Sequence, residues 1–402
     1  MVEDDNGAGA SADAGLGVPG GSPGGLTVAL CGDVLLHRRL WAQAALDGRR
    51  TGQDYDFGPM LAGLQSAVSS ADLAVAHLET PVGHPRGPFG GYPVYAVPPQ
   101  VLPALRAVGF AGVTTASNHS LDAGTAGIDR TIAALDEAGL RHAGTASSAA
   151  AASRTTVFEV GGVSVALLSF AYGFNGFRLP AGRSWAANPI DVPTMLDAAG
   201  RARAGGAQIV VVAVHAGDQY VSAPSTQQLR VFDALTRSDD VDFVYGHHAH
   251  VVQPLSRVNG KLVAYGLGNA VADLGRSLPE TRSGLLARVR FEPAAPGRFI
   301  ATSVDAVPTW MSSHRPLRWL DARSAGTAPV RVSAGLARAA RVVDRAVRSG
   351  TGPWLDAGPG RPGGGVPDVA PPARVGAARG GGRPAAAAPA GPADLVGDLA
   401  VG

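Results

Sequence analysis

Short apolar runs recur along the middle of the chain, and each is bounded by Gly, Pro, Asn or Asp. This pattern is typical of buried β-strands, whose side chains pack on both faces of a sheet. We predict strands at residues 26–31, 73–76, 112–115, 163–170, 209–214, 243–245 and 262–265. Two later runs, residues 285–291 and 299–307, have no helical segment between them and predict an antiparallel pair.

Amphipathic segments alternate with the first set of runs. Residues 225–238, for example, place Leu229, Phe232 and Leu235 on one expected apolar face. The other helices are predicted at residues 128–139 and 193–205. Alternation of strands with helices predicts an α/β fold, in which ligands bind at the C-terminal ends of the strands. The antiparallel pair indicates two sheets that pack against each other.

Residues 1–25 consist mainly of Gly, Ala, Ser, Pro and Asp, and residues 351–402 mainly of Gly, Pro, Ala and Arg; such sequences cannot form a packed core. We therefore predict disordered tails at residues 1–25 and 351–402, one domain at residues 26–330 and a C-terminal helix at residues 331–350. Across all 402 residues, 46% are hydrophobic and 16% are charged, a balance that supports a folded core.

Charge and cysteine content exclude several classes of protein. The formal net charge is +2, the arginines are scattered and Lys261 is the only lysine, so we expect no nucleic-acid partner. A single cysteine, Cys31, excludes an intrachain disulfide and a thiolate metal cluster within one chain. Its apolar surroundings are those of a buried strand residue.

The sequence also bears on the compartment of the protein. A membrane span needs about 18 apolar residues or more, and no run is that long. The start of the chain, Met1 to Asp5, is acidic and lacks the basic and apolar segments of a secretory leader. We expect a cytoplasmic protein, or a cell-surface protein if the natural N-terminus lies upstream.

Polar residues that suit metal binding follow five of the predicted strands. The candidate residues are Asp33, Glu79, Asn118, His119, His215, His248 and His250. Taken alone, Asp33 or Asn118 could cap a helix, Glu79 or His119 could be solvated, and His215 could be a core histidine. Three histidines within four residues after the fifth of these strands are the strongest signal. Oxygen and nitrogen ligands without thiolates favour Zn²⁺, Mn²⁺ or Fe over Ca²⁺ or Mg²⁺.

The order of these motifs resembles the CapA family of poly-γ-glutamate capsule biosynthesis proteins, within the calcineurin-like metallophosphoesterase superfamily. The motifs are Gly-Asp at 32–33, Leu-Glu at 78–79, Asn-His-x-x-Asp-x-Gly at 118–124, His-x-Gly at 215–217, Gly-His-His-x-His at 246–250 and Tyr-x-x-Gly-Asn at 265–269. The similarity runs from about residue 27 to about residue 270, and more loosely to about residue 330. It implies a four-layer α/β/β/α sandwich that binds two divalent transition metal ions (Mn, Zn or Fe) at one edge.

The resemblance also implies a role for each matching residue. The implied metal ligands are Glu79 as the bridge, Asp33 and His250 on one ion, and Asn118, His215 and His248 on the other. His119 would donate a proton or stabilise the transition state, and Asp122 would orient it. Arg38 would bind an anionic group of the substrate, and Asn269 would line the site.

Several positions depart from the usual pattern of the family. Leu35 stands where related phosphatases have a metal-binding histidine, and His37 is an alternative ligand. The other departures are His77 for Asn, Ala216 for Trp, Gln219 for Glu and Ala270 for Phe. At these positions the substrate and the activity can differ from those typical of the family.

The function expected from the ligand set and the resemblance is metal-dependent hydrolysis of a phosphoester or a γ-glutamyl-type bond. One alternative is a non-catalytic component that binds polyglutamate or supports capsule assembly, for which Arg38 and Arg86 are the candidate basic residues. Another is a tailoring hydrolase of small-molecule biosynthesis. The expected partners are an anionic small molecule or polyglutamate, together with capsule-assembly proteins.

Overall fold

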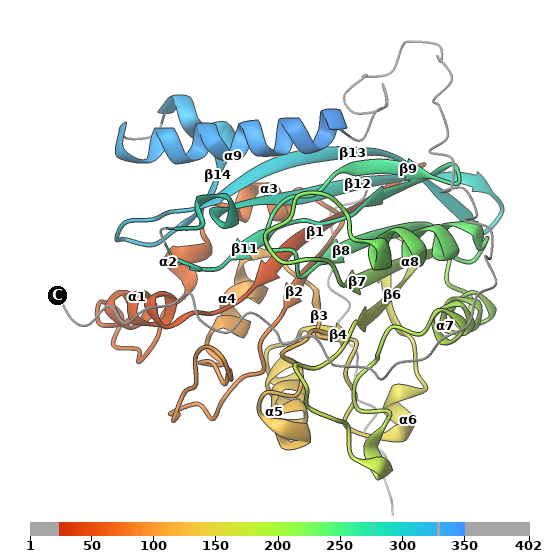
Figure 1. Cartoon of the computed structure of the whole chain (residues 1–402), viewed down its shortest axis with the longest axis horizontal. Coiled ribbons are helices and arrows are strands. Elements are labelled where there is room, and N and C mark those ends of the chain that lie inside the picture. The colour runs from red at the N-terminus through yellow and green to blue at the C-terminus, as the bar shows by residue number, and fades with distance from the viewer. Residues whose placement is uncertain (1–23, 276, 328–329, 350–402) are drawn as a thin grey trace, which may run out of the picture. The chain divides into compact units, whose positions relative to one another are not determined.

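A computed structural model describes residues 24–275, 277–327 and 330–349 (Figure 1). The tails predicted at residues 1–25 and 351–402 lie outside the described residues, apart from residues 24 and 25. The described part of the chain forms two β-sheets with helices on their outer faces.

The first sheet contains the N-terminal strands and the predicted antiparallel pair. Its strand order is β14-β13-β12-β1-β2-β3-β4, and β11 pairs with β1. The strands are β1 (Leu26–Val34), β2 (Leu73–Leu78), β3 (Gly112–Thr114), β4 (Arg141–Ala143), β11 (Asn269–Val271), β12 (Ser283–Ala295), β13 (Arg298–Met311) and β14 (Trp319–Asp321). Strands β1 to β4 run parallel, whereas β12, β13 and β14 pair antiparallel, which confirms the predicted antiparallel portion.

The second sheet has the strand order β5-β6-β7-β8-β10-β9. Its strands are β5 (Thr156–Val160), β6 (Val163–Ala171), β7 (Ile209–His215), β8 (Phe243–His247), β9 (Leu255–Val258) and β10 (Lys261–Ala264). The central strands β6, β7, β8 and β10 are parallel, and β5 and β9 are antiparallel at the two edges. Parallel strands place their C-terminal ends at one edge of a sheet, where ligands usually bind.

Alternating residues of the central strands face different layers, as the two-residue period of a strand requires. On β1, Val28 and Leu30 pack between the two sheets, whereas Ala29 and Cys31 pack against helices. On β7, Val211 faces the first sheet and Val212 faces the helices beyond the second sheet. Cys31 is thus a buried strand residue, as expected.

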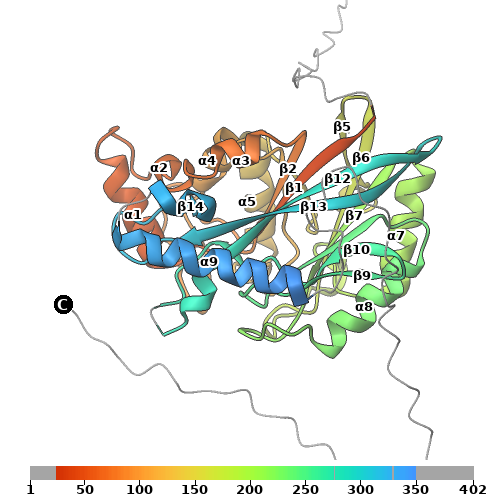
Figure 2. The same cartoon turned by 90° about the horizontal axis from the view of Figure 1, so that it is seen from above.

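Helices cover the outer face of each sheet (Figure 2). The first sheet is covered by α1 (Arg38–Gly48), α2 (Gly58–Leu61), α3 (Gln65–Ser69), α4 (Val101–Val108) and α5 (Gly124–Glu137), and the second by α7 (Val192–Ala204) and α8 (Thr226–Arg237). The result is the four-layer α/β/β/α sandwich that the resemblance implies. The remaining helices are α6 (Ala149–Ala152), α9 (Val330–Ser349), which lies along β12 and β13, and the 3₁₀ turns Ala181–Arg183, Pro279–Arg282 and Ala322–Thr327.

The apolar face of α8 differs from the prediction at one position. Leu229 is exposed, whereas Phe232 and Leu235 are buried as expected. The neighbouring residue Gln228 is buried instead. Its side-chain amide donates to Gln253 Oε1 at 2.7 Å and to the Tyr265 carbonyl at 2.8 Å. A polar side chain with these partners can be buried at little cost. Among the described helices, none is long and apolar enough to cross a membrane.

Candidate metal centre

Asp33 lies on β1 where the regular strand pairing is interrupted. The register of β1 shifts between Leu30 and Asp33 against β2, and between Asp33 and Val34 against β11. Such irregularities re-aim side chains at the edge of a sheet. Asp33 is fully buried and is not a helix cap, since α1 begins at Arg38 after His37. Its carboxylate lies 2.7 Å from His247 Nδ1 and 3.1 Å from His250 Nδ1.

Glu79 follows β2 and carries a buried carboxylate. The residue is 1% exposed, and neither Oε1 nor Oε2 has a hydrogen-bond partner among the described residues. Oε1 lies 3.7 Å from His250 Nε2 and 4.0 Å from His215 Nε2. Burial raises the pKa of Glu79 to about 7, although the nearby His250 opposes this shift. A solvated glutamate, the alternative for this position, is therefore excluded.

Asn118 and His215 meet from the two sheets. The Asn118 side-chain oxygen lies 2.8 Å from Nε2 of His215, at the end of β7. Asn118 does not cap α5, which begins at Gly124 after Ala123. Its side-chain amide instead donates to the Asn175 side-chain oxygen at 3.0 Å. The amide oxygen of Asn118 and the imidazole of His215 therefore converge on one point.

The loop after β8 brings two further imidazoles to the same edge. His248 and His250 both have positive φ angles, +82° and +57°, which non-glycine residues rarely adopt. The His248 backbone N–H donates to Asp33 Oδ2 at 3.3 Å, so the turn is fixed to β1. His250 Nδ1 lies 3.0 Å from the side-chain oxygen of Asn269, on β11. Backbone strain of this kind is concentrated at functional sites.

The pKa of His250 is raised above its usual value. Burial disfavours its charged form, but the carboxylates of Glu79 and Asp33 outweigh burial and raise the pKa to about 9. Burial instead lowers the pKa of His248, to about 3, and lowers that of His215 well below its usual value. His215 and His248 are therefore neutral, the form that binds metals, whereas His250 must lose a proton before it can bind one.

Three groups of potential ligands result, and within each group the ligand atoms lie within 4.8 Å of one another. The groups are Asp33, Glu79 and His250; Glu79, His215 and His248; and Asp33, His77 and His247. Glu79 belongs to the first and second groups and Asp33 to the first and third, so each carboxylate lies close to the ligand atoms of two groups. The first two groups, with Asn118 beside His215, contain the six metal ligands expected from the sequence.

His119 and Asp122 form a pair beside these groups. His119 Nδ1 lies 2.7 Å from Asp122 Oδ2, which also accepts the backbone N–H of Tyr95 at 2.8 Å. His119 is 7% exposed, and its ring makes an edge contact with the Tyr95 ring, with centroids 4.8 Å apart. The side-chain amide of Asn175 lies 3.2 Å from His119 Nδ1. His119 is thus held in place and is not a solvated surface residue.

Two candidates lie away from the ligand groups. Arg38 is exposed on α1, and its guanidinium lies 5.3 Å from the ring centroid of Trp41. His37, the alternative ligand, is in none of the three groups. Its Nδ1 lies 3.0 Å from the Leu35 carbonyl and 3.2 Å from the backbone nitrogen of Asp273. His37 is therefore not positioned as a metal ligand, and Arg38 stays a predicted substrate-binding residue.

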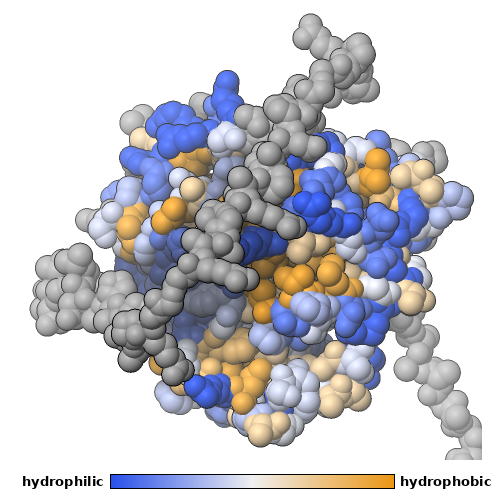
Figure 3. Space-filling model, turned by 45° about the vertical axis from the view of Figure 1, so that its right-hand side comes forward, coloured by the Kyte–Doolittle hydropathy of each residue, from blue (hydrophilic) through white to orange (hydrophobic). Residues whose placement is uncertain are grey.

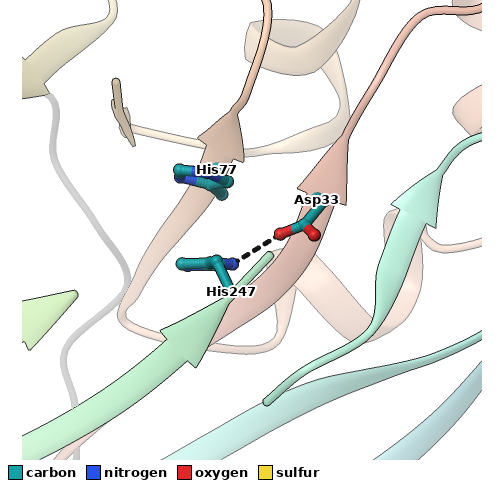
Figure 4. Close-up of side chains that lie close together, drawn as sticks. All are labelled: Asp33, His77 and His247. Carbon is teal, nitrogen blue, oxygen red and sulfur yellow. Dashed lines mark hydrogen bonds and ion pairs between the residues drawn. The ribbon is translucent and has the colours of Figure 1, made fainter. Parts of the chain in front are cut away.

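Sequence reasoning did not assign His77 and His247 to the site. The His77 ring stacks on the His247 ring with centroids 3.9 Å apart, and His247 contacts Asp33 (Figure 4). His77 also lies 2.9 Å from His215 and 2.8 Å from Thr114 Oγ1. The run of histidines after β8 was the available signal for His247. His77 carries only the weak signal of a polar residue within an apolar strand.

The chemistry of these side chains is compatible with bound divalent cations. Both oxygens of Glu79, Nδ1 of His248 and Nε2 of His247 are buried without a hydrogen-bond partner in the ranges that the structure describes. Buried polar groups are normally paired, and unpaired ones call for an unseen water or ion. Carboxylate, amide and imidazole groups together suit Zn²⁺, Mn²⁺ or Fe.

Two curated relatives are named for capsule synthesis. The PGA biosynthesis protein CapA of Bacillus subtilis (strain 168) is 30% identical over 206 residues, which cover 50% of this chain and 52% of that protein. The capsule biosynthesis protein CapA of Bacillus anthracis is 30% identical over 179 residues, which cover 44% of this chain and 43% of that protein. The chain thus spans about half the length of these relatives.

Similar solved structures include two phosphoester hydrolases. The calcineurin-like phosphoesterase YfkN from Bacillus subtilis has a TM-score of 0.43 and 13% identity, covering 80% of this chain and 98% of that chain. A 5'-nucleotidase precursor from Thermus thermophilus has a TM-score of 0.45 and 13% identity, covering 81% of this chain and 59% of that chain.

The family model for the bacterial capsule synthesis protein PGA_cap matches residues 27–274. The match begins in β1, extends beyond β11 and includes every strand end that carries a candidate ligand. Because it covers more than half of the sequence, the chain belongs to the bacterial capsule synthesis protein PGA_cap family.

Proposed function

We propose that the chain is a metal-dependent hydrolase that cleaves an anionic phosphoester or a γ-glutamyl-type amide at a dinuclear centre around Glu79. The supporting observation is the buried Glu79 carboxylate, whose two oxygens lack partners among the described residues while imidazoles approach from two sides. A buried carboxylate of this kind is costly unless a cation neutralises it.

Two sets of side chains would hold the ions. Asp33 and His250 would bind one, His215, His248 and Asn118 would bind the other, and Glu79 would bridge them. When bound, two such ions supply Lewis acidity and generate a nucleophile from water near neutral pH. The protein contributes positioned ligands: most lie at strand ends or on the turn fixed to Asp33, and Asn118 is held by its side-chain contacts with Asn175 and His215.

His119 is our candidate for the proton donor to the leaving group. Its Nδ1 is engaged with Asp122, which leaves Nε2 available for the reacting oxygen or nitrogen. The carboxylate of Asp122 fixes the orientation of the His119 ring. Asp122 is itself held by the Tyr95 backbone N–H, so we regard it as a positioning residue.

The names of the relatives favour a second candidate function, in which the chain binds polyglutamate without cleaving it during capsule assembly. The exposed side chains of Arg38 and Arg86 would then contact carboxylates of the polymer. Binding of this kind would persist after metal removal, since it would rest on the arginines. Hydrolysis would not persist.

Turnover by the full chain separates the two functions. The protein is stripped with chelator, reloaded with Mn²⁺ and assayed with bis(p-nitrophenyl) phosphate and with γ-glutamyl-p-nitroanilide. We expect Mn²⁺-dependent release of nitrophenol or nitroaniline, lost in Glu79→Gln and retained in Leu229→Ala, which alters an exposed residue of α8. Release that is unaffected by metal removal or by Glu79→Gln would contradict the proposal.

A further inference from the structure

Exposed apolar side chains are concentrated on three loops, and a tyrosine on each of two of these loops lies beside a candidate metal ligand. In the described part of the chain, eight large apolar residues are exposed, and six of them lie on three loops. The six are Tyr92 and Val94 between β2 and α4, Tyr172 and Phe177 between β6 and α7, and Tyr220 and Val221 between β7 and α8. Figure 3 shows that apolar side chains reach the surface in patches between hydrophilic ones. Contiguous exposed apolar groups mark binding surfaces, whereas single ones do not.

Four of these residues form what we call the aromatic rim: Tyr92, Tyr172, Phe177 and Tyr220. Tyr172 lies against His248, with ring centroids 4.7 Å apart, and Tyr220 lies 6.1 Å from His250. Both tyrosines are about two-fifths exposed, at 41% and 42%. One side of each ring therefore meets a candidate metal ligand, and much of the ring remains accessible to a bound molecule.

Two of the loops that carry rim residues contain a residue with a positive φ angle and a hydrogen bond to the candidate metal centre or its turn. Tyr220 has a φ angle of +67°, and its N–H donates to the Ala249 carbonyl, between the two histidines, at 2.7 Å. Asn175, between Tyr172 and Phe177, has a φ angle of +48°, and its side chain contacts Asn118 and His119. Strain that the fold maintains beside a site indicates a functional constraint on the loop.

The four rim side chains are three tyrosines and one phenylalanine, so none of them carries a formal charge near neutral pH. Arg38 lies beside the loop that carries Tyr92, because a Cβ on Gly91 would lie 3.1 Å from Arg38 Cγ. The rim thus offers aromatic faces with an arginine at one side.

We propose that the aromatic rim binds a planar apolar group of an anionic ligand whose charged head lies at the candidate metal centre. This inference rests on the proposed function, since the head is the group that would be cleaved. Tyrosine faces stack well on flat apolar groups and bind them at low entropic cost. A flexible chain of glutamyl carboxylates would instead require a row of cations, whereas the four rim residues are uncharged.

Calorimetry with two small phosphonates tests the inference. The Mn²⁺-loaded full chain, with its metal content measured, is titrated with phenylphosphonate and with methylphosphonate, which share a head group. We expect phenylphosphonate to bind about 10-fold more tightly, as one good stacking contact allows. The ratio should fall to about two in Tyr172→Ala/Tyr220→Ala and, less steeply, in Phe177→Ala. It should be unchanged in Leu229→Ala and Ile300→Ala, where exposed apolar residues lie on α8 and β13.

Each of the other outcomes contradicts the role of the aromatic rim, the proposed function or both. Equal affinities for the two phosphonates, or a ratio that survives loss of both tyrosines, would overturn the role of the rim and leave the proposed function intact. Tighter binding of penta-γ-glutamate than of phenylphosphonate would overturn it in favour of a polymer. Failure of the metal-loaded protein to bind either phosphonate would contradict both the proposed function and the inference.

Discussion

His77 Nε2 lies 2.9 Å from His215 Nδ1, and His77 Nδ1 lies 2.8 Å from Thr114 Oγ1. If His77 accepts the Nδ1 proton of His215, the Nε2 lone pair of His215 is directed at the point where Asn118 Oδ1 also converges. Partners of this kind fix the tautomer of a metal-binding histidine. We therefore predict that His77 positions His215 for metal binding.

Loss of this contact should weaken metal binding. We expect His77→Ala to lower Mn²⁺ affinity about 10- to 100-fold, the usual effect of removing a partner of a ligand histidine. His77→Asn should recover part of the loss, and His84→Ala, at an exposed loop position, should have no effect. Calorimetric titration measures the affinities. Equal affinity in His77→Ala and the unaltered protein would refute the positioning role.

Metal binding should strengthen as the pH rises. The raised pKa values of Glu79, about 7, and His250, about 9, mean that both hold a proton in the metal-free protein at low pH. Each proton must leave before the metal binds, so affinity should rise by about two log units per pH unit below pH 7, by about one between pH 7 and pH 9, and no further above that. Titrations in buffers of different ionisation enthalpy count the released protons. An affinity independent of pH would exclude these protonation states.

Asp122 should affect turnover without affecting metal content. Asp122→Asn removes the charge that lies 2.7 Å from His119 Nδ1 while keeping a similar side-chain shape. We expect turnover to fall about 100-fold or more, within the range for loss of acid–base catalysis. Elemental analysis should still find the metals of the unaltered protein. A variant with full activity would remove His119 and Asp122 from the mechanism.

Close backbone approach makes Gly246 sensitive to substitution. A Cβ at this position would lie 1.9 Å from the Tyr265 carbonyl oxygen, and the backbone on either side belongs to packed strands. We expect Gly246→Ala to reduce the free energy of unfolding by about 1–3 kcal/mol through overpacking. Gly182→Ala is the control, because nothing lies within 4 Å of its Cβ. Urea denaturation compares them, and equal stabilities would contradict the steric argument.

Much of the fold follows from local sequence patterns. Alternate residues of β1 and β7 face the space between the two sheets, and the others face the covering helices. Ser225 and Gln228 form a capping box at the start of α8. The helical pattern of apolar residues predicts a buried Leu229, which is exposed, because the pattern takes account only of the polarity of each residue. It cannot show that Gln228 finds buried partners at Gln253 and Tyr265, which are remote in sequence.

Local sequence patterns predict the candidate site only in part, because they do not show which residues from distant segments come into contact. Residues such as Asp33 and His250 stand out because polar groups follow apolar strands. The contacts of His77 with His215, and of Asn118 with Asn175, join segments that are far apart in the chain. Pairings of this kind depend on the packing of one sheet on the other, which no local pattern specifies. Arg38 matches a family motif, yet the structure places it over Trp41.

The metal content of the purified full chain tests the central claim most directly. Elemental analysis after Mn²⁺ loading and removal of free metal should find two ions per chain, and fewer than one in Glu79→Ala, where the shared carboxylate of the two ligand groups is missing. Exposed Leu229→Ala should retain both ions. Less than one ion per chain in the unaltered protein, or two ions in Glu79→Ala, would contradict a dinuclear centre built around Glu79.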